Sequence, residues 1–421
     1  MSATTDIAAR YDTIRAEQEA FYQDLHAHPE LSHRETRTAG RVADLLAEDG
    51  FAVTTGIGGT GVVGVLHRGD GPVVLVRADM DALPVREDTG AAYASTVEVD
   101  DGSGVAVPVM HACGHDAHVS CLVGAARLLA EAGDGAWSGT LVALFQPAEE
   151  TGDGARGMVD DGLLAKIPAP DVALAQHVLP FAAGRVATRP GAVLSSADSL
   201  RITVHGRGGH GSMPQNTVDP VVIAAQLVVS LQTIVSREVA PTDPAVVTVG
   251  SLRAGSKSNI IPDSAVIELN IRDYNTATRQ RILDAIRRIA DGVCTAGGCP
   301  QPPDIELFDS FPPTVNDPAV TARVAQAFGE VFGEDAGTLD LQTASEDFSD
   351  IPVAAGVPYT YWGIGGVDPA TWQAAVEAGR VLDDIPVNHS PRFLPVMQPT
   401  LRVGTTAVVA AALAWLAAPV A

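Results

Sequence analysis

Residues 71–85 read GPVVLVRADMDALPV, a short aliphatic run followed at once by Asp79 and Asp81. Two later stretches, GTLVALFQPAEE at 139–150 and DVALAQHV at 171–178, have the same character. Aliphatic runs without polar alternation are typical of strands buried on both faces of a sheet that helices cover. The three runs therefore predict an α/β domain.

Helical patterns lie between and around these runs. Residues 116–133 have apolar positions at helical spacing, with Asp116 suited to cap the helix start and Gly133 suited to end it. Residues 1–30 predict an amphipathic helix. Residues 404–421 carry no charge and reach the lower length limit of a membrane span, but their alanine content favours a helix packed on a domain.

Ionisable side chains follow each of the three apolar runs. In open α/β sheets, ligands collect outside the carboxyl ends of the strands. We therefore expect one edge of the predicted sheet to gather the following side chains: Asp79, Asp81, Glu149, Glu150 and His177.

The texture of the sequence changes near Pro190. A strand, a helix, two strands and a helix are predicted at 195–215, 218–238, 245–256, 264–275 and 276–293. The first of these helices opens at Asp219 and Pro220, which are residues typical of a helix start. This order of elements suits a compact sheet with two helices on one face.

The proline-rich residues 299–313 mark a boundary, after which the patterns typical of an α/β domain resume. The change near Pro190 and this boundary together indicate that a second domain is inserted into the first. The predicted parts are a catalytic domain in two pieces and the inserted domain, at 1–189, 307–421 and 190–306.

The chain has 421 residues, and its 51 acidic against 27 basic residues give a formal net charge of −24. This charge disfavours nucleic acid and anionic membranes as partners and favours a soluble protein. The start has no basic segment followed by an apolar one, so we expect a cytoplasmic location. Four cysteines do not make a disulfide framework in a chain of this size, and Cys294 and Cys299 are expected to be ordinary thiols.

The stretch PVMHACGHDAHVSC at 108–121 concentrates metal-binding side chains. Cys113 and His115, two positions apart in a glycine-containing turn, can face one metal ion or bridge two. The alternative is a buried free cysteine beside a structural histidine. The nearby side chains of His111, Asp116 and His118 favour the metal.

Glu149 and Glu150 follow a predicted buried strand, where like charges repel unless a cation or a shared proton relieves them. Adjacent acids on a surface are more often merely solvated. Two carboxylates at this place permit one to bind a metal and the other to take a proton from water. His177 and His389 are weak signals singly and become informative only as part of this set.

Several blocks of the sequence resemble those of the dinuclear metallo-amidohydrolases that include hippurate hydrolases, N-acyl-amino-acid amidohydrolases and auxin-conjugate hydrolases. The blocks are HAHPELSHRE, VRADMDALPV, MHACGHDAHVS, FQPAEETGDGARGMVDDG, QHV, GRGGHGSMP, GSKSNIIPD and ASEDFSDI, in order between residues 26 and 393. The resemblance implies a two-domain α/β fold, with a metallopeptidase-like catalytic domain and an inserted α+β dimerisation or lid domain. It also implies two divalent metal ions per chain, zinc or manganese, with cobalt or nickel also compatible.

Carried over position by position, the resemblance makes Cys113 a bridging ligand and Glu149 the general base. Asp79 and Asp81 fall where the wider clan has a ligand histidine and its supporting acid, so Asp81 is expected to orient a ligand histidine. The implied metal ligands are Cys113, His115, Glu150, His177 and His389.

In the inserted domain, His210 resembles the family histidine that reaches a neighbouring active site and stabilises the oxyanion. Asn259 and Arg272 resemble substrate-side residues, and a guanidinium suits a carboxylate, although Arg272 could instead only pair with Asp273 or another surface acid. The resemblance thus implies a homodimer or higher homo-oligomer that hydrolyses small N-acyl amino acids. A metal-dependent dipeptidase is the enzymatic alternative, and a purely structural metal protein would have no use for the extra acid at Glu149.

Overall fold

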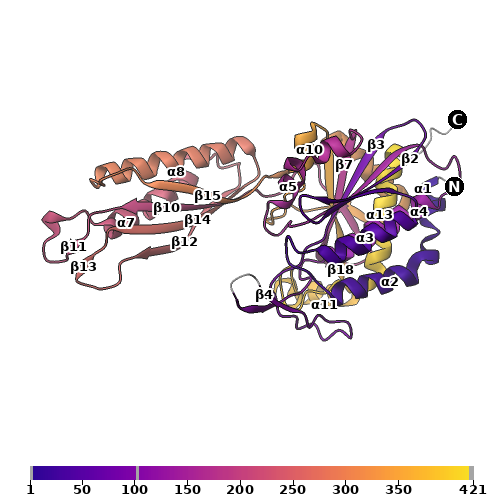
Figure 1. Cartoon of the computed structure of the whole chain (residues 1–421), viewed down its shortest axis with the longest axis horizontal. Helices are drawn as coiled ribbons and strands as arrows, with labels where there is room; N and C mark the ends of the chain where they lie inside the picture. The colour runs from indigo at the N-terminus through magenta and orange to yellow at the C-terminus, as the bar shows by residue number, and fades with distance from the viewer. Residues whose placement is uncertain (1–2, 101–103, 417–421) are drawn as a thin grey trace. The chain divides into compact units, whose positions relative to one another are not determined.

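The computed structural model describes residues 3–100 and 104–416, so the outermost residues of both expected terminal helices lie outside the described part. The chain forms two compact units (Figure 1). Unit 1 comprises Met1–Gly191, Asn316–Asp340 and Asp347–Ala421, and unit 2 comprises Ala192–Val315 and Leu341–Glu346. The inserted domain expected at 190–306 therefore corresponds to a unit that runs on to Val315 and includes a short second segment.

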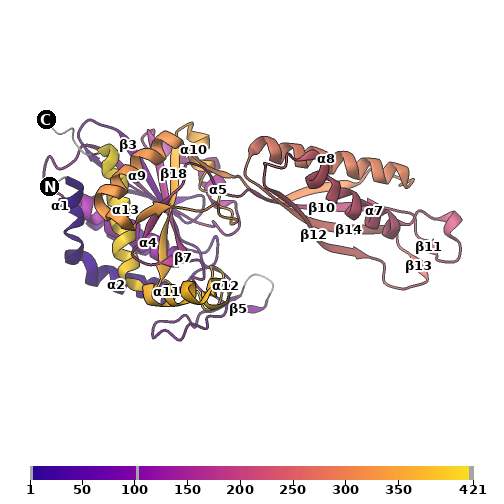
Figure 2. The same cartoon turned by 180° about the vertical axis from the view of Figure 1, so that it is seen from behind.

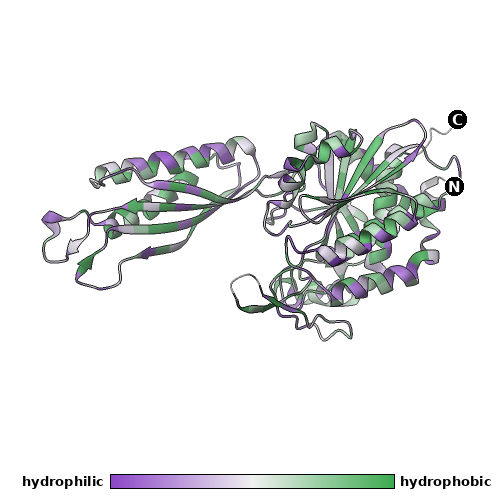
Figure 3. Ribbon diagram, in the orientation of Figure 1, coloured by the Kyte–Doolittle hydropathy of each residue, from purple (hydrophilic) through white to green (hydrophobic). Residues whose placement is uncertain are grey.

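Unit 1 is built on an eight-stranded mixed sheet with the strand order β1-β2-β6-β3-β7-β18-β8-β17. Its strands are β1 Ala52–Ile57, β2 Gly61–Arg68, β3 Val73–Asp79, β6 Gly139–Gln146, β7 Val172–Ala182, β8 Val186–Thr188, β17 Ala336–Thr338 and β18 Tyr359–Val367. The three predicted apolar runs are the neighbouring parallel strands β6, β3 and β7, which confirms the α/β prediction. Every residue of β6 is buried, and Figure 3 shows this sheet as mainly hydrophobic.

Helices pack around this sheet (Figure 2). They are α1 Ala3–Ala8, α2 Tyr11–Ala27, α3 Thr36–Glu48, α4 His115–Ala130, α5 Gly154–Asp160, α6 Leu163–Lys166, α9 Pro318–Phe332, η3 Gly333–Asp335, α10 Asp350–Ala355, α11 Pro369–Ala378, α12 Val381–Asp384 and α13 Met397–Leu416. A small hairpin, β4 Glu98–Asp100 and β5 Ala106–Pro108, also belongs to unit 1. The paired strands β9 Gly191–Leu194 and β16 Thr314–Asn316 lie where the chain passes from one unit to the other.

Helix α13 is long and apolar enough to span a membrane, as is Pro220–Glu238, but most of α13 is buried inside unit 1. It lies against α4 and against the central strands, so the described part of 404–421 forms a core helix, as expected.

The predicted cap of α4 is wrong. Gly114 occupies the N-cap position, and no side chain caps the helix. Asp116 lies inside the first turn, where its Oδ2 instead binds His26 Nδ1 at 2.6 Å.

Unit 2 contains a four-stranded antiparallel sheet with the strand order β12-β14-β10-β15. Helices α7 and α8 cover one face of it (Figures 1 and 2). The elements are β10 Ala197–His205, β11 Gly209–His210, η1 Pro214–Asn216, α7 Pro220–Thr233, the π-helical turn η2 Ile234–Glu238, β12 Ala245–Ala254, β13 Ile260–Ile261, β14 Ser264–Asp273, α8 Thr276–Ala296 and β15 Asp304–Phe311.

The five elements predicted for the inserted domain are all present, and α7 starts as predicted, with Asp219 accepting from the backbone N–H of Val221. Strand β15 was not predicted. It lies within the proline-rich residues 299–313, whose prolines flank an edge strand rather than ending the domain.

Candidate metal centre

The ionisable side chains expected at one sheet edge do gather there. Asp79 ends β3 and Asp81 follows it, Glu149 and Glu150 follow β6, and His177 lies within β7. Because β3, β6 and β7 are parallel neighbours, their carboxyl-terminal parts lie side by side.

A tight turn brings Cys113 and His115 to this edge. Gly114 between them has φ +84°, and a Cβ at this position would lie 2.4 Å from Cγ1 of Val178. Only glycine combines this backbone conformation with so close an approach. Asn388 holds the turn from the other side, because its Nδ2 donates to the carbonyl oxygen of Cys113 at 3.1 Å.

One ring nitrogen of His115 is held and the other is available. Its Nδ1 lies 3.2 Å from Oδ1 of Asp81, and Ser32 Oγ donates to Oδ2 of Asp81 at 2.7 Å. Its Nε2 is buried, makes no hydrogen bond among the described residues, and faces carboxylate oxygens of Glu149 at 3.9 Å and Glu150 at 3.8 Å. Asp81 thus lies where a residue that orients a ligand histidine is needed.

The carboxylates around His115 Nε2 favour a positive charge on or beside the ring. Burial lowers the pKa of His115, but the negative charge of Asp79 and the hydrogen bond with Asp81 outweigh burial and raise it well above its usual range. A proton on the ring meets this need in the metal-free protein, and a divalent cation would displace that proton.

His177 presents a nitrogen to Cys113. Its Nδ1 donates to the carbonyl oxygen of Val178 at 2.7 Å, so Nε2 carries the lone pair that faces Cys113 Sγ at 3.4 Å. Burial lowers the pKa of His177 well below its usual range, which keeps the ring in the neutral form that binds metals.

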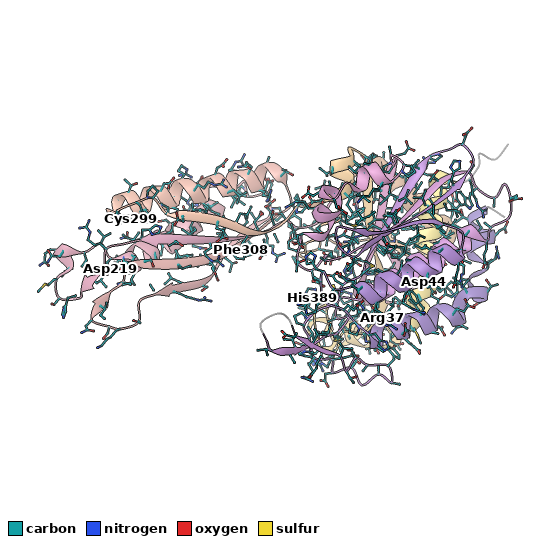
Figure 4. All side chains as sticks on the ribbon, in the orientation of Figure 1. Arg37, Asp44, Asp219, Cys299, Phe308 and His389 are labelled. Carbon is teal, nitrogen blue, oxygen red and sulfur yellow. The ribbon has the colours of Figure 1, made fainter. Side chains whose placement is uncertain are left out.

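His389, labelled in Figure 4, comes from the loop between α12 and α13. It has φ +70°, and its Nε2 lies 3.3 Å from Oε1 of Glu150. Interactions with Cys113 and Glu150 raise the pKa of His389 to about 10. Its side chain is 55% exposed whereas that of Glu150 is 9% exposed, so the centre is accessible from this side.

The donor atoms form overlapping sets that share the thiol of Cys113. Cys113, His115 and His177 form one set with ligand atoms within 4.8 Å of one another, and Cys113, Glu150 and His389 form a second. Burial raises the pKa of the Cys113 thiol, so a nearby cation is needed to keep it as a thiolate at neutral pH. The buried Oε1 of Glu150 makes no well-aligned hydrogen bond among the described residues, and the ring nitrogen of His389 lies 3.3 Å from it. Thiolate, imidazole and carboxylate donors arranged in this way fit divalent transition metals.

Asp79 and His118 lie beside the centre, with Asp79 Oδ2 3.8 Å from His115 Nε2, and with His115 they form a third set of donor atoms within 4.8 Å of one another. Asp79 accepts from Arg77 Nη1 at 2.6 Å and binds His118 Nδ1 at 2.5 Å. The other ring nitrogen of His118 accepts from the backbone N–H of Val178 at 2.8 Å. Both nitrogens of His118 are therefore occupied, and the residue orients the strand segment next to His177.

His210 and Asn259 lie side by side in unit 2. His210 pairs with Ile260 in the β11–β13 ladder, and the backbone N–H of Gly211 donates to the carbonyl oxygen of Asn259 at 2.9 Å. The His210 side chain is exposed and binds Ser212 Oγ at 2.7 Å.

Arg272 lies near the carboxyl end of β14, roughly 27 Å along the strand from its first residue, Ser264. Its Nε donates to Asn270 at 3.0 Å and its Nη1 donates to Ser345 Oγ at 2.6 Å. No ion pair between Arg272 and Asp273 or another acid is found among the described residues. The carboxylate of Asp273 instead accepts a hydrogen bond from Ser196 Oγ at 2.6 Å. Burial lowers the pKa of the Arg272 guanidinium.

Several supporting residues were not predicted from the sequence: Glu35, Arg77, Gln146, Asp347 and Asn388. The one available signal was Arg77, because a charge inside an otherwise aliphatic run indicates a buried ion pair. The others are recognisable only from contacts between distant segments.

Comparison with known proteins agrees with this geometry. The model of peptidase family M20/M25/M40 matches residues 75–386. A hippurate hydrolase from Campylobacter jejuni is 39% identical over 343 residues, covering 80% of this chain and 85% of that protein. Thermostable carboxypeptidase 1 from Saccharolobus solfataricus is 36% identical over 348 residues, covering 81% of this chain and 84% of that protein.

A solved structure is also similar over almost the whole chain. It is that of a dinuclear metal binding peptidase of the M20 family from Bacillus subtilis, with a TM-score of 0.76 and 27% sequence identity. The match covers 95% of this chain and 98% of that one.

Proposed function

Because this chain belongs to peptidase family M20/M25/M40, whose model matches most of its length, we propose that it is a metal-dependent amidohydrolase of N-acyl amino acids. It would release a carboxylic acid and a free amino acid. The observation that carries the proposal is the pair of donor sets sharing Cys113, with the further buried carboxylate of Glu149 beside them. The similar hippurate hydrolase supports this substrate class.

We further propose that Cys113, His115, Glu150, His177 and His389 hold two divalent ions, zinc or manganese. The similarity to a dinuclear metal binding peptidase supports the number of ions. Bound there, the ions would acidify a water molecule and polarise the amide carbonyl of the substrate.

Glu149 performs the proton transfers. Its carboxylate is 6% exposed, and its Oε2 lies 3.9 Å from His115 Nε2, next to the donor atoms. It accepts a proton from the attacking water and returns that proton to the nitrogen of the leaving amine. His210 donates to the oxyanion that forms at the amide carbon, and Arg272 and Asn259 bind the substrate, with the guanidinium suited to its carboxylate.

The protein acts as a homodimer or higher oligomer through unit 2. Helices α7 and α8 border an apolar groove of about 690 Å³, lined by Val221, Val222, Val229 and Val293 among others. Val229 is 71% exposed, and such a cluster of exposed apolar side chains is typical of a protein interface. A second copy would cover this groove and could supply His210 to a neighbouring centre.

The test of the function combines metal content with turnover. Purified protein should contain about two divalent ions per chain and should hydrolyse hippurate or N-acetyl-methionine. A chelator should abolish the activity, and added zinc or manganese should restore it. Protein without bound metal under every condition would overturn the centre.

Substrate panels separate this proposal from its nearest alternative, a metal-dependent dipeptidase or aminopeptidase-like enzyme, which requires a free amine on its substrate. The same amino acid should be offered with an acyl group and with a free-amine residue on its nitrogen. Faster release from the acylated compound supports the amidohydrolase, whereas faster release from the dipeptide supports the alternative.

A further inference from the structure

Three buried carboxylates from separate segments hold the loop that carries Glu149 and Glu150. This loop, residues 147–153, connects β6 to α5. The backbone N–H groups of Ala148, Glu150 and Ala155 donate to Glu35 at 2.9 Å, Asp81 at 3.0 Å and Asp347 at 2.9 Å, respectively. Hydrogen bonds from amides to ionised acceptors are stronger than neutral ones, so these contacts restrain the loop backbone.

Asp347 is distinctive because it binds both sides of the loop. Its Oδ2 accepts from Ala155 in the first turn of α5, and its Oδ1 accepts from Gln146 Nε2 at 2.7 Å, at the end of β6. Gly154 shows how tightly the loop closes, because a Cβ there would lie 1.8 Å from the carbonyl oxygen of Pro147. One carboxylate therefore ties the residue before the loop to the helix after it.

Arg77 links Asp347 and Gln146, which hold the loop, to the histidine side chains of the centre. The side chain is fully buried, and its Nε donates to Gln146 at 2.8 Å while its Nη2 lies 3.3 Å from Asp347. Its Nη1 donates to Asp79, which holds His118 and, through it, the backbone beside His177. A single guanidinium thus joins both halves of the centre.

We propose that Asp347, held by Arg77 and Gln146, is a positioning residue for the general base. In this role the two oxygen atoms of Asp347 accept hydrogen bonds, and Asp347 acts through the backbone that carries Glu149 and Glu150. Its carboxylate also lies within 4.8 Å of those of Glu149 and Glu346, so the exchange measurement below separates the backbone effect from a direct effect of its charge on Glu149. The proposal rests on the proposed amidohydrolase function for its kinetic consequence, and on the loop contacts alone for its structural consequence.

The test compares Asp347→Asn with Asp350→Asn. The first change removes the charged acceptor of the Ala155 amide, because an asparagine side chain cannot supply two acceptor oxygens. Asp350 is the control, since its carboxylate contacts the same helix α5 through the side chain of Arg156, at 2.9 Å. Each variant is measured fully loaded with zinc or manganese, by kcat, KM, metal content and hydrogen exchange.

Asp347→Asn should lower kcat by roughly 10- to 100-fold, since small displacements of a reacting group have effects of this size. KM should stay within about twofold and metal content should not change, because substrate-side residues and ligands are intact. Amide exchange should accelerate in a peptide covering residues 147–156 and stay unchanged in α13. Asp350→Asn should alter none of these.

A folded, metal-loaded Asp347→Asn protein with wild-type kcat overturns the proposal, and so does a fall in kcat without faster exchange in 147–156. If Asp347→Asn does not fold, Gln146→Met takes its place, because it removes the hydrogen bond between Gln146 and Asp347. It should lower kcat and accelerate exchange in the same peptide, both to a smaller extent. If the wild type hydrolyses no acylated amino acid, the proposed function fails, while the exchange comparison still tests whether Asp347 closes the loop.

Discussion

At the scale of single residues, Cys113 is the side chain on which the proposed metal centre depends most. Its sulfur belongs to both donor sets, and burial raises the pKa of its thiol. A metal-free Cys113 is therefore protonated near neutral pH, and metal binding must release that proton. Metal affinity should consequently weaken as the pH falls.

Replacing Cys113 tests its shared role. Cys113→Ala should lose most of the bound metal and nearly all activity, because both donor sets lose a member. Metal analysis after gel filtration measures the first effect. The matched change Cys121→Ala removes a buried thiol outside the donor sets and should leave metal content unchanged; equal metal loss in both variants would contradict the bridging role.

Oxidation provides a second test of the same sulfur. Mild peroxide should displace metal and lower activity, and a thiol reductant should restore both if oxidation stops at the sulfenic acid or a disulfide. Activity that is indifferent to peroxide would argue against a ligand thiolate.

His26 gives the protein a stability contribution that depends on pH. Its ring lies between Asp116 at 2.6 Å and Glu87 at 3.1 Å. Burial alone would lower the pKa of His26, but the two carboxylates outweigh burial and raise it to about 9. Because the folded-state pKa is raised, the contribution is fully present below the unfolded-state value near 6.5 and is lost as the pH rises through about 9.

We therefore expect His26→Gln to lower Tm strongly at pH 6 and much less at pH 10. Thermal melts of wild type and variant in matched buffers measure the difference. His28→Gln is the control, since His28 is half-exposed and should show a small effect at either pH. A difference between wild type and His26→Gln that grows with pH would contradict the assignment.

At the scale of elements, prediction succeeded where local pattern and topology coincide. The runs that became β3, β6 and β7 carried their acids and His177 to one edge, because parallel strands share an edge whatever their distance along the chain. It failed where a contact with a residue or strand far along the chain determines the local structure. The sequence suits Asp116 to cap α4, but its carboxylate binds His26 of α2 instead. Strand β15 lies between prolines at the edge of its sheet and is stabilised by pairing with β10.

The turn before α4 shows how the start of a helix positions the proposed metal ligands Cys113 and His115. Gly114→Ala should destabilise the fold by about 1–3 kcal/mol, from the positive φ and the clash with Val178. It should also reduce metal content, because relief of the clash moves Cys113 and His115. Denaturant unfolding and metal analysis measure both effects. Gly133→Ala, beyond the end of α4 with open space around it, should change neither.

At the scale of the whole molecule, the exposed groove of α7 and α8 is the test of assembly. Val229→Lys should convert a dimer into monomers, because a charge in an apolar contact is costly. Light scattering after gel filtration measures the mass. Val376→Lys, at an exposed valine of α11 in unit 1, is the control. A monomeric wild type would contradict the proposed assembly.

Mixing inactive variants tests whether a second copy supplies His210. Glu149→Gln protein retains His210, and His210→Asn protein retains Glu149. If the centre uses His210 from another copy, randomly mixed dimers should recover about a quarter of wild-type activity, since half are mixed and each has one competent centre. No recovery on mixing would mean that each chain uses its own His210 or none.

The order of segments along the chain has a consequence for biosynthesis. Strand β18, the proposed ligand His389 and the core helix α13 all follow the residues of unit 2 on the chain, yet they belong to unit 1. On the ribosome, the segments that carry Cys113, Glu150 and His177 are therefore made first and stay without part of their unit while unit 2 is synthesised. Unit 1 is then the last part to close its core, and its apolar strands are the part of the nascent chain that most needs chaperone protection.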